Sequence, residues 1–194
     1  MLSLKRPMTR LLICVSLWLF AGAMPVALAA DRVDEEGLLM AAFIYNFALF
    51  TQWPETDTPD AKGAPFALCI AGEDALVESI SRLKGKIIKG RPLVIQSFKD
   101  AQNATPVSKK CQLLYVARSE KKNLFNLLKT VRGQSVMTLS ELPQFADTGG
   151  VVELYRENGR IRFMINLTVA RKVGLEISPN LLKLATSVIG AESF

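Results

Sequence analysis

The segment Phe66-Ala67-Leu68-Cys69-Ile70-Ala71 is short and apolar throughout, and Gly72 follows it directly. These features are typical of a β-strand. Further strands are expected at residues 93–98, 112–117 and 135–139, and amphipathic helices at residues 74–83 and 119–132. This alternation of strands and helices favours a sheet with parallel pairs that are joined by right-handed crossovers.

The sequence before this stretch predicts a long helix over residues 33–51. The segment lacks proline, and its apolar side chains cover almost the whole circumference of a helix. A helix that is apolar all round is buried, either inside its own domain or against another chain. We expect the helix to end near Trp53-Pro54, because the residue before a proline disfavours the α conformation.

The sequence after it predicts a C-terminal β-hairpin. Asn158-Gly159 separates two β-rich runs and is a strong signal for a two-residue turn. Asn166 is expected to cap a short helix, and Ser178-Pro179 to begin a final amphipathic helix that extends to Ile189. The expected fold is α/β: a single compact domain with a mixed, mostly parallel sheet, flanking helices and this hairpin.

The N-terminus has the pattern of a secretory signal peptide. Basic residues precede an apolar run over residues 11–23, and Ala27-Leu28-Ala29 is the small-x-small sequence that signal peptidase recognises. A membrane-spanning helix needs roughly 20 apolar residues, more than this run contains. We therefore expect export to the periplasm, cleavage of residues 1–29, and one α/β domain over residues 30–194.

Removal of the leader changes the charge of the protein. The full chain has 24 basic and 18 acidic residues, and the leader holds three of the basic ones and no acidic one. The mature chain would therefore carry a net charge of +3 in place of +6. A weak positive charge that is spread along the chain does not indicate nucleic-acid binding.

Two cysteines, Cys69 and Cys111, remain after removal of the leader. An even number of cysteines in an exported chain favours a disulfide, and each of the two lies in or beside a predicted strand. If these strands lie close together in one sheet, the sulfurs can meet, and closing the loop would contribute roughly 4 kcal/mol at most. The alternative is two separate buried thiols.

The search for catalytic chemistry is negative. The sequence contains no histidine, which excludes histidine-dependent triads and histidine zinc sites. It has no redox Cys-x-x-Cys pair and no glycine-rich phosphate loop. The paired carboxylates lie near predicted helix starts, where acids are favoured by the helix dipole. We therefore expect a protein that is not an enzyme and that has no cofactor and no metal.

Trp53 and Pro54 are candidates for contact with a partner or ligand, because they follow the apolar helix and tryptophan is a frequent anchor at interfaces. The alternative is that they pack against their own domain.

Four cations near the C-terminus form a second candidate surface. Arg160 and Arg162 lie on the outer face of the predicted hairpin, and Arg171 and Lys172 lie on the helix that follows. Together they would form a small basic patch for an anionic ligand or an acidic partner. The alternative is ordinary solvated charge.

The order of several short motifs resembles that of the YfiR-like family of periplasmic proteins. The first motif is Ala-Phe-Ile-Tyr-Asn-Phe-Ala-Leu-Phe-Thr-Gln-Trp-Pro at residues 42–54, and residues 66–72 and 111–116 hold the next two. The later motifs are Gly149-Gly150, residues 158–163, residues 165–167, Ala170-Arg171, Gly174-Leu175, Ile177-Ser178 and residues 181–185. The resemblance covers residues 33–189, and it rests on the combined order of these motifs.

The resemblance implies a function in signalling. Proteins of the YfiR-like family bind the periplasmic sensor region of an inner-membrane diguanylate cyclase, repress the synthesis of cyclic-di-GMP and so limit biofilm formation. An OmpA-type outer-membrane lipoprotein can sequester the repressor. The family also tends to form homodimers, which would suit an apolar first helix. No nucleic-acid partner is implied.

The resemblance further implies that the pair Cys69 and Cys111 is a family disulfide. Some family members have a second cysteine pair near the Gly-Gly turn. This sequence has Phe145-Ala146 and Val152-Glu153 in that region, so a redox switch at a second bridge is not expected.

Two other classes of function stay open. The first is a periplasmic small-molecule sensor or carrier that acts on a sensor kinase and uses an α/β cleft near Arg171. The second is an unrecognised hydrolase, which the absence of histidine disfavours.

Overall fold

The computed structural model describes residues 26–54, 64–98 and 111–191. The chain divides into two compact units, Met1–Glu35 and Glu36–Phe194, and the second unit contains the sheet. The predicted leader lies mostly outside the described residues, and its cleavage stays a prediction. In the part that is described, we find no helix with the length and apolar character needed to cross a bilayer.

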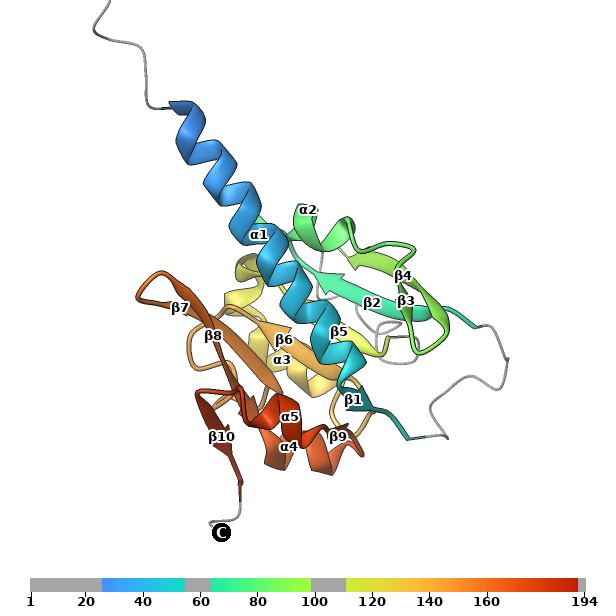
Figure 1. Cartoon of the computed structure of the whole chain (residues 1–194). Coiled ribbons are helices and arrows are strands. Elements are labelled where there is room, and N and C mark those ends of the chain that lie inside the picture. Colours follow the sequence, from blue (N-terminus) through green and yellow to red (C-terminus); the bar gives the residue numbers. More distant parts are fainter. Residues whose placement is uncertain (1–25, 55–63, 99–110, 192–194) are drawn as a thin grey trace, which may run out of the picture. The chain divides into compact units, whose positions relative to one another are not determined.

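An eight-stranded sheet forms the centre of the second unit, in the order β10-β8-β7-β6-β5-β2-β4-β3 (Figure 1). The strands are β2 (Phe66–Ala71), β3 (Ile87–Ile88), β4 (Arg91–Phe98), β5 (Leu113–Val116), β6 (Met137–Ser140), β7 (Val152–Glu157), β8 (Arg160–Asn166) and β10 (Ser187–Ile189). Neighbouring strands are parallel except in the β3–β4 and β7–β8 pairs, which are antiparallel. The prediction of a mixed, mostly parallel sheet with a C-terminal hairpin is confirmed.

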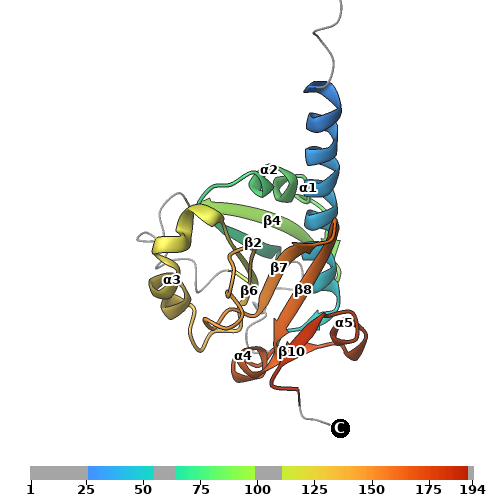
Figure 2. The same ribbon diagram turned by 90° about the vertical axis from the view of Figure 1, so that its left-hand side faces the viewer.

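Helices cover both faces of this sheet. They are α1 (Val26–Leu49), α2 (Leu76–Ser81), α3 (Leu124–Thr130), α4 (Leu167–Lys172) and α5 (Pro179–Leu182), and a 3₁₀ helix (Arg118–Lys122) precedes α3. Figure 2 shows α1 and α3 on opposite sides of the sheet. The short strands β1 (Thr51–Gln52) and β9 (Glu176–Ile177) pair antiparallel with each other outside the main sheet.

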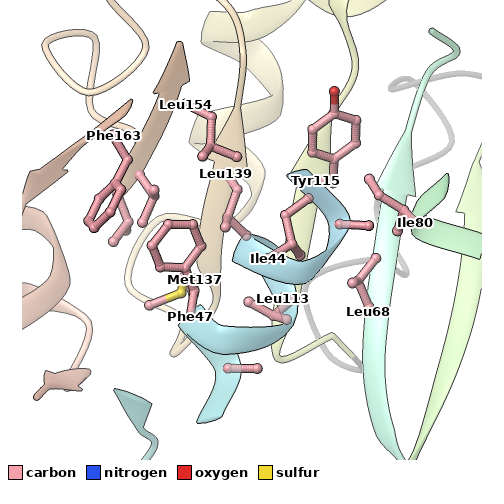
Figure 3. Packing of buried hydrophobic residues seen from close by; sticks show 14 of the residues in the cluster. Ile44, Phe47, Leu68, Ile80, Leu113, Tyr115, Met137, Leu139, Leu154 and Phe163 are labelled. Atoms are coloured by element: carbon pink, nitrogen blue, oxygen red, sulfur yellow. The ribbon is translucent and has the colours of Figure 1, made fainter. Parts of the chain in front are cut away.

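The larger part of the core lies between α1 and the sheet. Ile44 and Phe47 point from α1 toward Leu113 and Leu139, and all four side chains are buried (Figure 3). The ring of Phe47 lies edge-on to that of Phe163 on β8, with centroids 5.0 Å apart. One face of the predicted helix is therefore buried in its own domain.

A second core lies on the α3 side of the sheet. Alternate residues of a strand point to opposite faces, so Cys69 and Leu114 face α3 while Leu68 and Leu113 face α1. Cys69 and Cys111 form a disulfide with a Cα–Cα distance of 5.8 Å in this second core. Of the two alternatives that the sequence leaves open, the structure has the bridge.

Two segments that were expected at the ends of helices form strands instead. The first helix ends at Leu49, and Thr51 and Gln52 instead pair with β9. The final helix ends at Leu182, and residues 187–189, which were expected to be helical, form the parallel edge strand β10 beside β8. Strand β8 offers free backbone groups along its outer edge, and this segment binds them. The pairing begins where the N–H of Thr186 donates to the carbonyl of Phe163.

The loop between β6 and β7 is held in place without a disulfide. The carboxylate of Glu153 accepts hydrogen bonds from the backbone N–H groups of Gln144 and Ala146, each at 3.1 Å. Phe145 is fully buried and occupies the space beside Gly150, where any Cβ would clash with its ring. These contacts hold the region in which the resemblance to other proteins raised the question of a second bridge.

Candidate functional site

The outer face of α1 carries an exposed apolar stripe. Leu39, Ala42, Leu49 and Phe50 are exposed, together with the polar Asn46, and their spacing of three to four residues places them on one side of the helix. Leu39 is 53% exposed and Phe50 is 44% exposed, whereas Ile44, which faces the sheet, is fully buried. The expectation of a helix buried all round therefore holds for one face only, and the other face is open.

A shallow hollow continues the stripe toward α5. It has a volume of about 150 Å³, and its lining includes Phe43, Phe50, Phe163 and Leu184. Leu184 is 71% exposed and follows directly after the exposed Lys183. We use the name "α1 stripe" for the surface formed by Leu39, Ala42, Phe43, Asn46, Leu49, Phe50 and Leu184. Apolar surface of this kind, with little polar interruption, is characteristic of a protein-binding site.

The β3–β4 hairpin flanks the α1 stripe on the other side. Tyr45 of α1 donates a hydrogen bond from its hydroxyl to the carbonyl of Ile87, at 2.7 Å, and so fixes the hairpin beside the helix (Figure 1). The hairpin turns at Lys89 and Gly90, which both have positive φ angles. Ile87 itself is 54% exposed at this end of the hairpin.

Two lysines of this hairpin lie over aromatic rings. Lys86 Nζ is 5.9 Å from the ring centroid of Tyr45, and Lys89 Nζ is 5.9 Å from that of Trp53. Partial burial lowers the pKa of Lys89 from its ordinary value. Neither lysine forms an ion pair within the described part of the chain. Both cations therefore contact aromatic rings of the domain, and in the described part of the chain no acid pairs with them.

Lys89 is also close to the end of the α1 stripe. A polar hollow of about 320 Å³ is lined by Leu49, Phe50 and Lys89 together with Glu176, an exposed acid on β9. Phe50 lines both this hollow and the apolar one beside α5. The apolar stripe and the basic hairpin therefore form one continuous surface.

Trp53 and Pro54, which the sequence marked as contact residues, are both half-buried. The indole N–H of Trp53 donates to the carbonyl of Gln112 at 3.2 Å, and its ring lies edge-on to Phe66 with centroids 5.1 Å apart. Pro54 occupies the space beside Gly174. Trp53 thus packs mainly against its own domain, although it also supports the cation of Lys89.

The four cations near the C-terminus do not lie together. Arg160 begins β8, and Arg171 and Lys172 lie on α4 beyond the other end of that strand. A seven-residue strand is about 20 Å long, so Arg160 and Arg171 are well separated (Figure 1). Arg162 forms an ion pair with Glu157, with 3.7 Å between Nε and Oε2. The four cations are close in the sequence, but the extended strand β8 separates Arg160 from Arg171 and Lys172.

A larger cleft lies between α3 and α4. It has a volume of about 480 Å³, its lining includes five valines and one leucine, and Arg132 and Lys172 also line it. Both helices end beside this cleft, at Thr130 and Lys172. Because carbonyl groups gather at helix C-termini, cations at these positions also have an ordinary structural explanation.

Polar side chains fill the carboxyl ends of β2 and β5, where the strand order of the sheet reverses and where ligands bind in many α/β folds. Asp74 accepts hydrogen bonds from the hydroxyl of Tyr115, at 2.8 Å, and from the backbone N–H of Arg118, at 2.9 Å. Burial, reinforced by the charges of Asp74 and Glu141, raises the pKa of Tyr115, so its phenol stays protonated and donates. The polar atoms at this position are therefore bound to one another.

Beside this cluster, Arg156 forms ion pairs with Glu36 of α1 and with Glu141, the latter at 2.7 Å. The side chain of Glu141 is only 5% exposed, and it also pairs with Arg118 at 3.3 Å. The network joins α1 to the ends of β6 and β7. Within the described segments, no group of three or more Cys, Asp or Glu residues is placed to bind a metal ion.

Sequence reasoning did not assign a role to the basic hairpin. The cations of residues 84–91 and the exposed Ile87 are visible in the sequence, and so is the surplus of apolar residues in the first helix. The sequence alone does not show that these two segments lie side by side, because they are about 40 residues apart and joined only through tertiary contacts.

Comparisons with known proteins agree with the fold. A family model described as YfiR/HmsC-like matches residues 38–186. A search of curated proteins gives no match. A solved ABC domain in complex with L-Trp from Streptococcus pneumonia is similar in fold, with a TM-score of 0.53, 13% identity, and coverage of 64% of this chain and 55% of that one.

A conserved domain protein from Vibrio cholerae O1 biovar El Tor strain N16961 has a TM-score of 0.48 and 13% identity, with coverage of 63% of this chain and 54% of that one. The chain thus spans about half the length of these two solved structures.

Proposed function

Since the chain belongs to the YfiR/HmsC-like family, we propose that it is a periplasmic regulatory protein that represses an inner-membrane diguanylate cyclase by direct contact. Repression would lower cyclic-di-GMP and limit biofilm formation. An OmpA-type outer-membrane lipoprotein would relieve repression by sequestering the protein, and the repressor would act as a homodimer. The mature chain would correspond to residues 30–194.

The α1 stripe is the observation that supports this proposal best. Exposed leucine and phenylalanine side chains gather on one helix face and extend onto α5, where water would otherwise contact them. Burial of such surface favours association by roughly 25 cal/mol per Å² of apolar area before the costs of ordering are counted. The surface suits a protein that acts by binding.

Repression by binding needs no catalytic group in this chain. A cyclase that exchanges between an active and an inactive state is shifted toward the state that the repressor binds more tightly. A shift of the cyclase from mostly active to mostly inactive requires a preference of about 10⁴-fold, or about 5.5 kcal/mol. This preference must arise on the periplasmic side of the membrane, because the exported protein meets its partner there.

We expect co-expression with the neighbouring diguanylate cyclase to lower cellular cyclic-di-GMP several-fold relative to the cyclase alone. A variant without residues 2–29 is the control, because it stays in the cytoplasm and should leave the cyclic-di-GMP level unchanged. The measurement is quantification of cyclic-di-GMP in cell extracts. Equal levels with and without the full-length protein would contradict the proposal, and repression by the leaderless variant would contradict a periplasmic site of action.

The cleft between α3 and α4 supports a second candidate function, that of a small-molecule sensor or carrier acting on a sensor kinase. Its volume of about 480 Å³ is within the range of about 300–1,000 Å³ that is typical of ligand sites. L-tryptophan, the ligand bound in the Streptococcus structure, is a first probe, followed by other amino acids and aromatic carboxylates.

A ligand that binds the native state at 100 times its Kd stabilises that state by about 2.7 kcal/mol, which for a domain of this size is a rise of several degrees in Tm. We expect such a rise if the cleft is a ligand site, and replacement of Lys172 by Glu should reduce it for an anionic probe. A melting temperature that no probe raises would contradict this second function.

A further inference from the structure

We propose that the α1 stripe and the β3–β4 hairpin together form a docking surface for an acidic amphipathic segment of the protein partner. This inference rests on the proposed function and names the surface that carries it. The α1 stripe supplies the apolar half of the surface. Lys86 and Lys89 supply the charged half along one border.

The apolar half fits a helix or a strand with one apolar side. Leu39 and Ala42 on α1 lie in line with Phe50 just after it, and the hollow beside α5 adds a recess whose lining includes Phe43 and Leu184. An apolar recess of this kind suits helix-in-groove recognition, in which apolar side chains of an amphipathic helix enter a hydrophobic groove. An apolar side chain of the partner would enter the recess between α1 and α5.

The charged half of the surface indicates that the partner segment carries a negative charge. Lys86 and Lys89 have no ion pair within the described residues, and stacking on Tyr45 and Trp53 holds both ammonium groups beside the stripe. These contacts restrict both side chains before binding, which reduces the entropy cost of forming ion pairs with a partner. One exposed acid, Glu176, lines the hollow that contains Lys89. Two lysines against one glutamate leave a net positive border.

A second copy of this chain fits the surface less well than an acidic partner. The border toward the hairpin carries Lys86 and Lys89, and the border toward α5 carries Lys183 next to Leu184. Two copies that faced each other through the α1 stripe would therefore bring like charges together, which disfavours association. An acidic amphipathic segment meets both borders with opposite charge.

The test measures how tightly the protein binds its cyclase. The protein is expressed from the full-length sequence and purified after export, the full-length cyclase is held in phosphatidylcholine nanodiscs, and the affinity is measured by biolayer interferometry. Lys86→Glu together with Lys89→Glu should weaken binding at least tenfold, mainly through slower association, and should make the affinity less sensitive to salt. The control is Lys121→Glu with Lys122→Glu, which makes the same change of charge at two exposed positions of the 3₁₀ helix. This control should change the affinity less than twofold.

A second pair of replacements, Leu39→Ser and Phe50→Ser, removes the apolar half and should also weaken binding at least tenfold. Melting temperatures identify any variant that fails to fold. Light scattering of the protein alone tests whether a second copy covers the stripe.

The outcomes separate the two proposals. If the unaltered protein does not bind the cyclase, the proposed function and this inference both fail. If the unaltered protein binds and the Lys86→Glu, Lys89→Glu variant binds equally well, only this inference fails. It also fails if the Lys121→Glu, Lys122→Glu control loses as much affinity as the Lys86→Glu, Lys89→Glu variant. It fails again if the unaltered protein is a dimer and the Leu39→Ser, Phe50→Ser variant is a monomer that still binds the cyclase.

Discussion

Replacement of both Cys69 and Cys111 by alanine should lower the free energy of unfolding by about 2–5 kcal/mol. The bridge joins residues 42 positions apart, for which the chain-entropy relation gives about 4 kcal/mol. It also ties β2 to the start of β5, two central neighbours of the sheet. Both cysteines are buried in the α3-side core, so the loss of packing adds to the loss of the constraint on the unfolded chain.

Urea denaturation of the oxidised protein measures this effect. Alanine is preferred to serine, because a buried hydroxyl without a partner would add a cost of its own. The double variant should also have a larger m-value, since its unfolded chain exposes more surface. A loss below 1 kcal/mol would show that the bridge adds little to the packing around it.

The same experiment bears on redox sensitivity. The loop between β6 and β7 is held by Phe145, Gly150 and the carboxylate of Glu153, none of which a reductant alters. Reductant should therefore destabilise the unaltered protein and leave the Cys69→Ala, Cys111→Ala variant unchanged. If reductant also destabilised the variant, Cys69–Cys111 would not be the sole source of the redox sensitivity.

The strands were predictable from the sequence because burial leaves a simple pattern. Phe66–Ala71 is buried on both faces of the sheet, so each of its residues is apolar. Residues 160–166 were predicted with the observed bounds, because Asn158-Gly159 fixes both the turn and the register that follows. The fold class follows from such local signals.

The candidate surface was less predictable, since it depends on tertiary contacts. The apolar composition of α1 indicated that all its faces need a partner, but the sequence does not say which face the sheet already covers. The lysines of the hairpin look like ordinary solvated charge until Tyr45 and Trp53 are found beneath them. The error at residues 187–189 has the same origin, because Val188 and Ile189 suit either the apolar face of a helix or a strand.

Two phenylalanines three residues apart, Phe47 on α1 and Phe50 directly after it, should separate stability from binding. Phe47 is fully buried and packs edge-on against Phe163, so Phe47→Ala leaves a cavity and should cost about 3–5 kcal/mol of unfolding free energy (Figure 3). Phe50 is 44% exposed on the α1 stripe, so Phe50→Ala should cost at most about 1 kcal/mol. The backbone bonds of residue 50, to Asn46 and Ser178, remain in the Phe50→Ala variant.

For repression we expect the reverse: at a temperature where both variants are folded, Phe50→Ala should be more harmful than Phe47→Ala. Phe50→Ala removes an aromatic anchor that lines both hollows, so it should weaken binding to the cyclase by about 2 kcal/mol, or about 30-fold, and raise cyclic-di-GMP. Phe47 has no exposed atom, although its ring also lines the hollow beside α5, so the folded fraction of Phe47→Ala should lose less affinity than Phe50→Ala. Urea titrations and cyclase binding of the same preparations give both quantities. Equal effects of the two variants on binding would mean that the partner does not contact this face of α1.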